Sequence, residues 1–378
     1  MSDEFDTEIS SCPEGWEVKK LGEILRVKRG KRLVRRELST RGLYPVYQNS
    51  LAPLGFFESY NCDAQSAFII AAGNAGEVGY SNTAFWAADD CFYFTDCKDL
   101  HQKFLYYTLL HNQFYIYSQT RRTSIPRLSQ DVVANMLIPF PPLHEQQAIA
   151  DTLTVFDTHI TNLAELIAKK KAIRDGALDD LMSGRTRLKG FSGEWTVKKL
   201  GEVVSCRKDR ARVPTKMYVT TENMKQNFEG IEHYTGKDFM TGIAFYCSDI
   251  LLSNIRPYLR KVYFADFCGS CSPDVLALKA EENICAKFLY YCIANDKFIY
   301  YVMSGGVKGT KMPRGDKQYI MQYYINLPPL DEQQAIADTL TALDNEINAL
   351  EAERSKIIQI RDGAMNDLLT GKVRLVHH

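Results

Sequence analysis

The sequence predicts an α+β protein in which two variable α+β domains alternate with two long helices. The 378-residue chain repeats itself, and two matched segments recur at offsets of 179 and 187 residues. Each repeat ends in a stretch whose apolar residues follow a helical period. The stretches between contain short aromatic and β-branched runs bounded by Gly and Asn, which is typical of strands and turns. Together these observations favour a duplicated α+β plan.

Each repeat has a constant part and a variable part. Trp16-Glu-Val-Lys-Lys-Leu-Gly-Glu-Ile24 recurs as Trp195-Thr-Val-Lys-Lys-Leu-Gly-Glu-Val203, and residues 142–188 share 26 identities with 329–375. The intervening residues scarcely resemble each other. The period far exceeds the roughly 20–50 residues of a solenoid repeat, so it indicates a duplicated two-part module. The predicted boundaries are an acidic tail at 1–14, variable domains at 15–141 and 189–328, and helical segments at 142–188 and 329–378.

Each constant segment is expected to form one long helix. Its apolar residues alternate at spacings of four and three, the average period of a coiled coil. Pro142 and Pro329 precede the predicted starts, and Gly184 and Gly371 lie where a C-terminal stop is expected. Since neither helix can bury its stripe alone, each is expected to pack on the other. The predicted seam comprises Ile149, Leu153, Phe156, Ile160, Leu163 and Ile167, with Ile336, Leu340, Leu343, Ile347 and Leu350.

Two glycines lie inside these predicted helices. Gly176 and Gly363 occupy equivalent positions of the repeat, and each would cost about 1 kcal/mol relative to alanine. Either a close approach of two backbones or a break in the helix would explain them.

The variable domains are predicted to mix strands with a short helical region. Ser66-Ala-Phe-Ile-Ile-Ala71 and Asp249-Ile-Leu-Leu-Ser253 have the composition of strands. A helical pattern follows from Phe104 to Tyr115 and from Phe288 to Tyr300. Periodicity does not fix the topology.

The formal net charge of zero conceals a segregation of charge. Residues 1–14 carry a net −5, and the helical segments 144–182 and 331–369 carry −3 and −6, which leaves +14 on the remainder. No apolar run approaches the roughly 18 residues of a membrane helix, and the acidic start is unlike a signal peptide. We therefore expect a soluble, cytoplasmic protein without a membrane partner, whose variable domains are basic.

The basic residues form clusters at corresponding places in both variable domains. Arg and Lys bind phosphates, and neighbouring Arg, Asn and Gln side chains can read base edges. Solvated surface loops are the alternative interpretation. The residues predicted to contact DNA are Arg29, Lys31, Arg32, Arg35, Arg36, Gln48, Asn49, Asn74, Arg121, Arg122 and Arg127 in the first domain, and Arg207, Lys208, Arg210, Asn223, Asn254, Arg256, Tyr258, Arg260, Lys311 and Arg314 in the second.

Catalytic, cofactor and metal motifs are missing from the sequence. There is no P-loop, and Asn326-Leu-Pro-Pro329 lacks the order of an amino-methyltransferase signature. Cys268-Gly-Ser-Cys271 is the single C-x-x-C, and a structural zinc site needs two further ligands. The ten cysteines are expected to be free and mostly buried thiols. We predict no catalytic, cofactor-binding or metal-binding residue in this chain.

The sequence resembles the specificity subunits of type I restriction-modification systems. The resemblance rests on Pro-Pro-Leu-x-Glu-Gln-Gln-Ala-Ile-Ala-Asp-Thr-Leu at 141–153 and 328–340, on the Ile-Arg-Asp-Gly-Ala repeats, and on the Trp-x-Val-Lys-Lys-Leu-Gly-Glu openings. Tyr44-Pro-Val-Tyr47 and Ser253-Asn-Ile-Arg-Pro-Tyr258 also look like parts of target recognition domains. The similarity covers nearly all of 15–375.

The resemblance implies two pseudo-symmetric α+β target recognition domains separated by two long antiparallel coiled-coil helices. Each domain would read one half of a split site in double-stranded DNA, and the helices would set the spacer. It further implies two methyltransferase subunits docked on the helices and two ATP-dependent restriction subunits. Those partners would bind S-adenosylmethionine, ATP and Mg, and would methylate adenine at N6.

Two other functions remain open from the residues alone. One is a self-contained DNA methyltransferase, which would need a cofactor loop and a catalytic signature. The other is a coiled-coil scaffold that binds no DNA, against which the paired basic clusters argue. Methyl transfer by the isolated chain would identify the first, and salt-dependent DNA binding separates the second.

Overall fold

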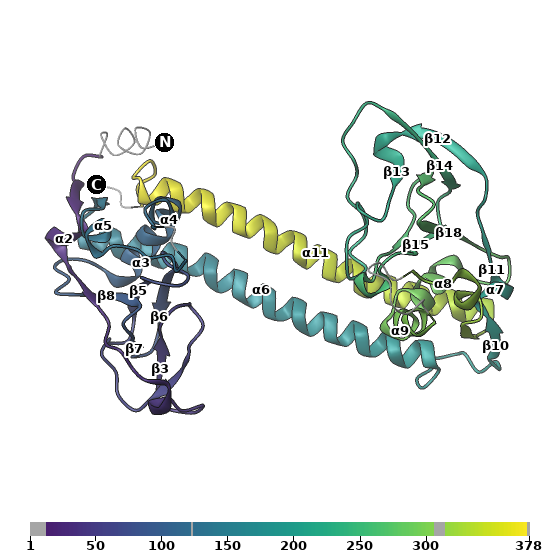
Figure 1. Ribbon diagram of the computed structural model, residues 1–378, viewed down its shortest axis with the longest axis horizontal. Coiled ribbons are helices and arrows are strands. Elements are labelled where there is room, and N and C mark those ends of the chain that lie inside the picture. The colour runs from purple at the N-terminus through teal and green to yellow at the C-terminus, as the bar shows by residue number, and fades with distance from the viewer. Residues whose placement is uncertain (1–12, 122–123, 306–313, 376–378) are drawn as a thin grey trace. The chain divides into compact units, whose positions relative to one another are not determined.

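The computed structural model describes residues 13–121, 124–305 and 314–375. The chain divides into two compact units: unit 1 comprises Met1–Glu165 and Glu351–His378, and unit 2 comprises Leu166–Leu350. Each unit contains one variable domain, the beginning of one long helix and the end of the other (Figure 1). The fold class is therefore α+β, as predicted.

Unit 1 is built around a four-stranded sheet in the order β2-β8-β5-β6. A three-stranded sheet, β4-β3-β7, accompanies it, and β1 pairs with β9 so that the two ends of the variable domain meet. The strands are β1 Glu17–Lys20, β2 Arg26–Arg29, β3 Tyr44–Tyr47, β4 Gly55–Phe57, β5 Ser66–Ile70, β6 Val78–Ser81, β7 Trp86–Ala87, β8 Cys91–Thr95 and β9 Leu137–Phe140.

Unit 2 repeats this construction. Its central sheet has the order β11-β18-β15-β16, a second sheet has the order β12-β14-β17-β13, and β10 pairs with β19. The strands are β10 Thr196–Lys199, β11 Val204–Cys206, β12 Arg210–Pro214, β13 Tyr218–Val219, β14 Phe239–Phe245, β15 Ile250–Ser253, β16 Val262–Phe264, β17 Gly269–Cys271, β18 Val275–Ala280 and β19 Tyr324–Leu327.

The apolar runs predicted as strands are the middle strands β5 and β15. Along β5, Ala67 and Ile69 belong to the main core of unit 1, while Phe68 and Ile70 belong to a second core on the other face. A strand that is buried on both faces is apolar at every position, because successive side chains point to opposite sides.

Short helices surround each central sheet, and one sequence prediction needs correction here. The helical pattern from Phe104 to Tyr115 is two helices that meet at Asn112, and the pattern from Phe288 to Tyr300 is likewise broken at Ala294–Asn295. Asn112 Nδ2 donates to the Thr108 carbonyl, four residues back, at 2.8 Å, and the same carbonyl accepts the backbone N–H of Asn112 at 3.2 Å. The helices are α2 Leu21–Ile24, α3 Gln102–His111, α4 Gln113–Ser118, α5 Gln130–Ala134, α7 Leu200–Val203, α8 Ala286–Ile293, α9 Asp296–Ser304 and α10 Lys317–Ile320, with single 3-10 turns at Arg35–Glu37, Thr215–Met217 and Pro257–Leu259.

The two long helices are α6, Leu143–Ser183, and α11, Leu330–Leu369. Both stop where expected: Gly184 and Gly371 follow them with φ of +72° and +73°, the left-handed conformation that glycine adopts easily. Within unit 1 the start of α6 and the end of α11 run antiparallel, because Glu145 pairs with Arg374 and Asp157 with Arg361. Unit 2 repeats the arrangement with the roles of the helices exchanged.

The apolar residues predicted to form a seam between the two helices are buried only in part by helix–helix packing. Ile149 and Leu153 lie in the core of the first variable domain, together with Leu368 and Leu369 of α11. Ile336 and Leu340 occupy the equivalent place in unit 2. Each stripe is thus covered jointly by a domain and by the other helix. Of the remaining seam residues, Leu163, Ile167 and Ile347 are buried, whereas Phe156, Ile160, Leu343 and Leu350 are half-buried.

The mid-helix glycines fit neither explanation given above. Both α6 and α11 continue without a break through Gly176 and Gly363, and an added Cβ at either position would meet nothing within 4 Å. These glycines are exposed.

Candidate nucleic-acid interface

The repeated motifs prove to be the residues that attach each variable domain to the helices. In unit 1 the buried Glu145 carboxylate accepts hydrogen bonds from Trp16 Nε1 at 2.9 Å and Arg374 Nη2 at 2.8 Å. Burial of the carboxyl group raises its pKa, but the hydrogen bonds from these two partners outweigh that effect and hold the pKa of Glu145 below its ordinary value. We refer to Trp16, Glu145 and Arg374 as the first Trp–Glu–Arg cluster.

Unit 2 contains the second Trp–Glu–Arg cluster. The Glu332 carboxylate accepts hydrogen bonds from Arg187 Nε and Nη2 at 2.6 and 2.7 Å and from Trp195 Nε1 at 3.1 Å. The side chain of Glu332 is fully buried. In both clusters the arginine comes from the end of one repeat and the glutamate from the start of the long helix of the other, which explains why Trp, Glu and the final Arg recur.

A second repeated contact joins the domain helices to the long helices. Tyr107 donates to Asp157 Oδ2 at 2.7 Å, and Arg361 lies 3.3 Å from the other oxygen of that carboxylate. In unit 2 the same roles fall to Tyr291, Asp344 and Arg174, with a Tyr–Asp hydrogen bond of 2.7 Å. The residues that recur in both repeats therefore attach the variable domains to the long helices. Sequence inspection shows these residues as identities of the repeat without revealing their partners.

In unit 1 the structure brings several predicted DNA-contacting residues together. A surface cavity of about 250 Å³ is lined by Arg32, Arg35, Gln48 and Asn49, with Leu33, Val34 and Leu54. Lys31 and Arg36 are exposed beside it in the chain. The cavity thus combines guanidinium groups with amide side chains.

A backbone network extends this cluster. The Asn49 carbonyl accepts from Asn74 N at 3.0 Å, and Ala72 forms a bridge with Arg127, which in turn bridges Arg121. All four polar residues are exposed. Arg29 is also exposed, although its Nε donates to the Asp89 carbonyl. Arg122 lies outside the described residues.

In unit 2 the predicted residues gather on the connection between β15 and β16. Arg256 and Arg260 both adopt left-handed backbone conformations, with φ of 50° and 54°, and Tyr258 between them is exposed. Such conformations are unfavourable for residues other than glycine and are frequent at functional sites. Ile255 forms a bridge with Arg314, so this predicted residue, although far along the chain, lies at the same loop.

Other predicted residues of unit 2 have partners inside the protein. Arg207 forms two hydrogen bonds of 2.9 and 3.0 Å with Asp249, which raise the pKa of the Arg207 guanidinium. The buried amide of Asn223 donates to the Tyr218 and Glu232 carbonyls. These contacts assign Arg207 and Asn223 to the support of loops.

The remaining members of the predicted set differ in their surroundings. Arg260 pairs with Asp296 at 2.8 Å and Arg314 with Asp274 at 3.2 Å, while both stay partly exposed. Lys208 and Arg210 are exposed, Arg210 on the edge strand β12. Asn254 accepts a backbone hydrogen bond from Gly315 at 3.0 Å. Lys311 lies outside the described residues.

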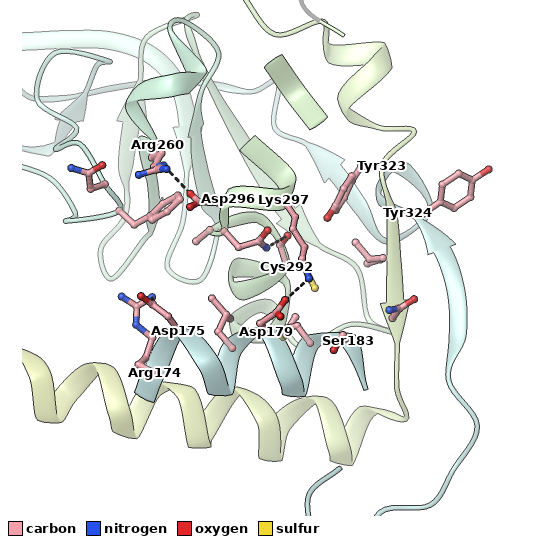
Figure 2. A pocket seen from close by; sticks show the side chains of 18 residues that line it. Arg174, Asp175, Asp179, Ser183, Arg260, Cys292, Asp296, Lys297, Tyr323 and Tyr324 are labelled. Carbon is pink, nitrogen blue, oxygen red and sulfur yellow. Dashed lines mark hydrogen bonds and ion pairs between the residues drawn. The ribbon is translucent and has the colours of Figure 1, made fainter. Parts of the chain in front are cut away.

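A cavity of about 490 Å³ lies in unit 2 between α6, α9 and β19. Figure 2 shows that Lys297 reaches Asp179 of α6 and that Arg260 reaches Asp296. Leu178, Met182 and Phe228 are among its apolar lining residues. Because the charges around it are paired with each other, this cavity has no evident preference for an anion such as a phosphate.

The long helices expose apolar side chains at equivalent positions of the repeat. Leu143 and Leu330, at the two helix starts, are 50% and 52% exposed, and Ile173 and Ile360 are 57% and 43% exposed. Each unit therefore presents one such leucine and one such isoleucine.

Within the described ranges, no helix is both long and apolar enough to cross a membrane. Over the same residues, no group of three or more His, Cys, Asp or Glu side chains is arranged to hold a metal ion. Of the C-x-x-C pair, Cys268 is exposed and Cys271 is buried.

Comparison with known proteins identifies the family. The profile of the type I restriction modification DNA specificity domain matches residues 13–171 and 192–359. The type I restriction enzyme MjaVIII specificity subunit of Methanocaldococcus jannaschii is 25% identical, with 96% of this chain and 94% of that protein covered. The EcoDI specificity subunit of Escherichia coli is 23% identical over 86% of this chain and 80% of its own length.

Solved structures show the same fold. The S subunit of a type I restriction-modification system from M. genitalium superimposes with a TM-score of 0.67 at 20% identity, covering 94% of this chain and 96% of that one. A chain from a study of type I R-M complex assembly gives a TM-score of 0.54 at 16% identity, covering 96% of this chain and all of that one. With two matches of the family profile, one in each repeat, the chain belongs to the type I restriction-modification specificity subunit family.

Proposed function

We propose that this protein recognises a bipartite, asymmetric DNA site, with each variable domain reading one half. The observation that carries the proposal is the exposure of arginine side chains on the divergent loops of both domains, joined in the first domain by amide side chains. In unit 1 these are Arg32, Arg35, Gln48 and Asn49, which line one cavity. In unit 2 the loop of Arg256 and Tyr258 is the counterpart. Arg with Asn or Gln is the combination that distinguishes bases in the major groove.

We further propose that α6 and α11 set the unspecified spacer and dock two methyltransferase subunits. The repeated exposed leucine and isoleucine side chains, and the net acidic charge of the helical segments, support a protein partner at this surface and disfavour DNA there. Restriction subunits would complete the assembly in the cytoplasm. In this proposal the chain is not catalytic: S-adenosylmethionine, ATP and Mg are bound by the partners, and the product is N6-methyladenine in each half-site.

The test is half-site specificity. Arg256→Ala, measured in the full chain with its methyltransferase partner on a DNA library, should change recognition of one half-site only, by about 1–3 kcal/mol if the contact is bidentate. Arg32→Ala is the matched variant, and it should affect the other half-site only. Weakening that is uniform over all sequences would place these residues on phosphates, where each contact contributes about −0.9 to the log–log salt slope.

The spacer and the absence of catalysis have separate tests. Removal of equivalent heptads from α6 and α11 should shorten the tolerated spacer, and an unchanged spacer would refute the role of the helices. Transfer of labelled methyl groups to DNA by the isolated chain would refute the non-catalytic assignment. Methylome sequencing of the host with and without this gene would give the site and the modified base together.

A further inference from the structure

Two of the described cysteines are exposed, and they lie next to each other. Cys247 and Cys268 are the exposed members of the set, whereas the other described cysteines are buried or half-buried. The two thiols lie near enough for Cys268 to raise the pKa of Cys247. Two accessible neighbouring thiols are arranged differently from thiols that merely fill a core.

The sheet of unit 2 fixes this proximity. Strands β14 and β17 pair antiparallel, with Phe245 opposite Gly269. Cys247 follows β14 by two residues and Cys268 immediately precedes β17, so both leave the sheet at the same end. Ser248 N donates to the Ala265 carbonyl at 2.8 Å, and this backbone bond holds the two segments together.

The surroundings distinguish this pair from the buried thiols. Burial raises the pKa of Cys62 to about 12 and strongly raises that of Cys91, both in a core of unit 1. Desolvation by neighbouring atoms and the adjacent Cys268 thiol raise the pKa of Cys247 as well, but its sulfur remains open to a reagent. Access to the attacking sulfur is a condition of thiol–disulfide exchange, and the buried thiols lack it.

We propose that Cys247 and Cys268 form a reversible intramolecular disulfide and are a redox modification site of this protein. The oxidant is a low-molecular-weight disulfide of the glutathione class. The thiolate of one cysteine attacks this disulfide, forms a mixed disulfide and releases one small thiol. The thiolate of the second cysteine then attacks the protein sulfur of the mixed disulfide and expels the second small thiol. Two protein thiols lose two electrons and two protons, and one small disulfide becomes two thiols.

The experiment is equilibration of the full chain in glutathione buffers of graded ratio, followed by acid quenching, alkylation in denaturant and mass spectrometry. The expected result is one cross-linked peptide pair that joins Cys247 and Cys268 and is two hydrogens lighter than the same two peptides with free thiols. The remaining cysteines should be alkylated. Reduction with excess thiol should restore both alkylation sites. This site is independent of the proposed DNA recognition, so the outcome does not depend on that function.

Single variants supply the control. Cys247→Ser should trap a glutathione adduct on Cys268, and Cys268→Ser should trap one on Cys247, because the resolving thiol is gone. Cys285→Ser, which alters a half-buried thiol elsewhere in unit 2, should leave the cross-link intact. Separate glutathione adducts on Cys247 and Cys268 of the unaltered chain would overturn the proposal. So would full alkylation of both residues at every ratio.

Discussion

Replacement of Arg187 by alanine should lower the free energy of unfolding of unit 2, because a buried carboxylate is left without its cation. The side chain of Glu332 is 0% exposed, and Arg187 supplies two of the three hydrogen bonds described for it. Loss of one partner of a buried ion pair costs about 3–5 kcal/mol. Because the Arg187 side chain is 30% exposed, water can reach part of the vacated space, so the lower end, about 3 kcal/mol, is expected for Arg187→Ala. Trp195→Phe removes a single hydrogen bond to the same carboxylate and should cost about 1.5 kcal/mol.

Hydrogen exchange resolved by residue is the suitable assay, since two units need not unfold in one transition. Arg187→Ala should lower protection across unit 2 and much less in unit 1. Arg374→Ala, the matched change in the first Trp–Glu–Arg cluster, should give the reverse pattern. The double variant Arg187→Ala/Glu332→Gln should recover part of the loss, because it also removes the stranded charge. The reasoning is refuted if Arg187→Ala changes protection evenly in both units, or if the double variant is as unstable as the sum of its parts.

Three further predictions concern the supports and the helices. Because the pKa of Glu145 is depressed in the folded protein, its contribution to stability is present above the ordinary value of 4.5 and is lost as the pH falls through the lower folded value. The free energy of unfolding of unit 1, measured with urea, should therefore decrease in acid. Glu145→Gln should make that free energy less dependent on pH. Tyr107→Phe removes the hydrogen bond to Asp157 and should lower protection of α3 by about 1.5 kcal/mol; an unchanged exchange rate would contradict this. Gly176→Ala, with nothing near the added Cβ, should raise helix stability by about 1 kcal/mol in thermal unfolding, whereas Gly184→Ala, at φ +72°, should lower it.

The fold could be predicted from the sequence wherever the spacing of residues close together in the chain determines the local structure. The helix stripe, the stop glycines and the strands buried on both faces depend on local period and local backbone. The break at Asn112 depends on whether an amide turns back to the Thr108 carbonyl or points to solvent, and the sequence does not encode that choice locally. The exposed position of Gly176 depends on what surrounds the helix, which its own period cannot reveal.

For the candidate DNA interface, the sequence indicates which types of residue are present but not which of them have partners inside the protein. Arg32 and Arg207 look alike in the sequence, since both lie in basic clusters at the start of a variable domain. The structure separates them, because Asp249, 42 residues away, holds Arg207 in a bidentate pair while Arg32 lines an open cavity. A basic residue that forms a buried ion pair with a distant carboxylate is less available for a contact at the surface. Pairing at that distance has no short-range signature.

The closing contact of Arg374 with Glu145 bears on the order in which the protein can fold during synthesis. Unit 2 is one continuous stretch, Leu166–Leu350, so all its residues have been synthesised before the end of α11 is made. Unit 1 contains both the beginning and the end of the chain. Its core cannot be complete until Leu368 and Leu369 have been synthesised, and its buried Glu145 has no ion-pair partner until Arg374 has been synthesised. The domain translated first is therefore completed last, which reverses the usual N-terminal-first order.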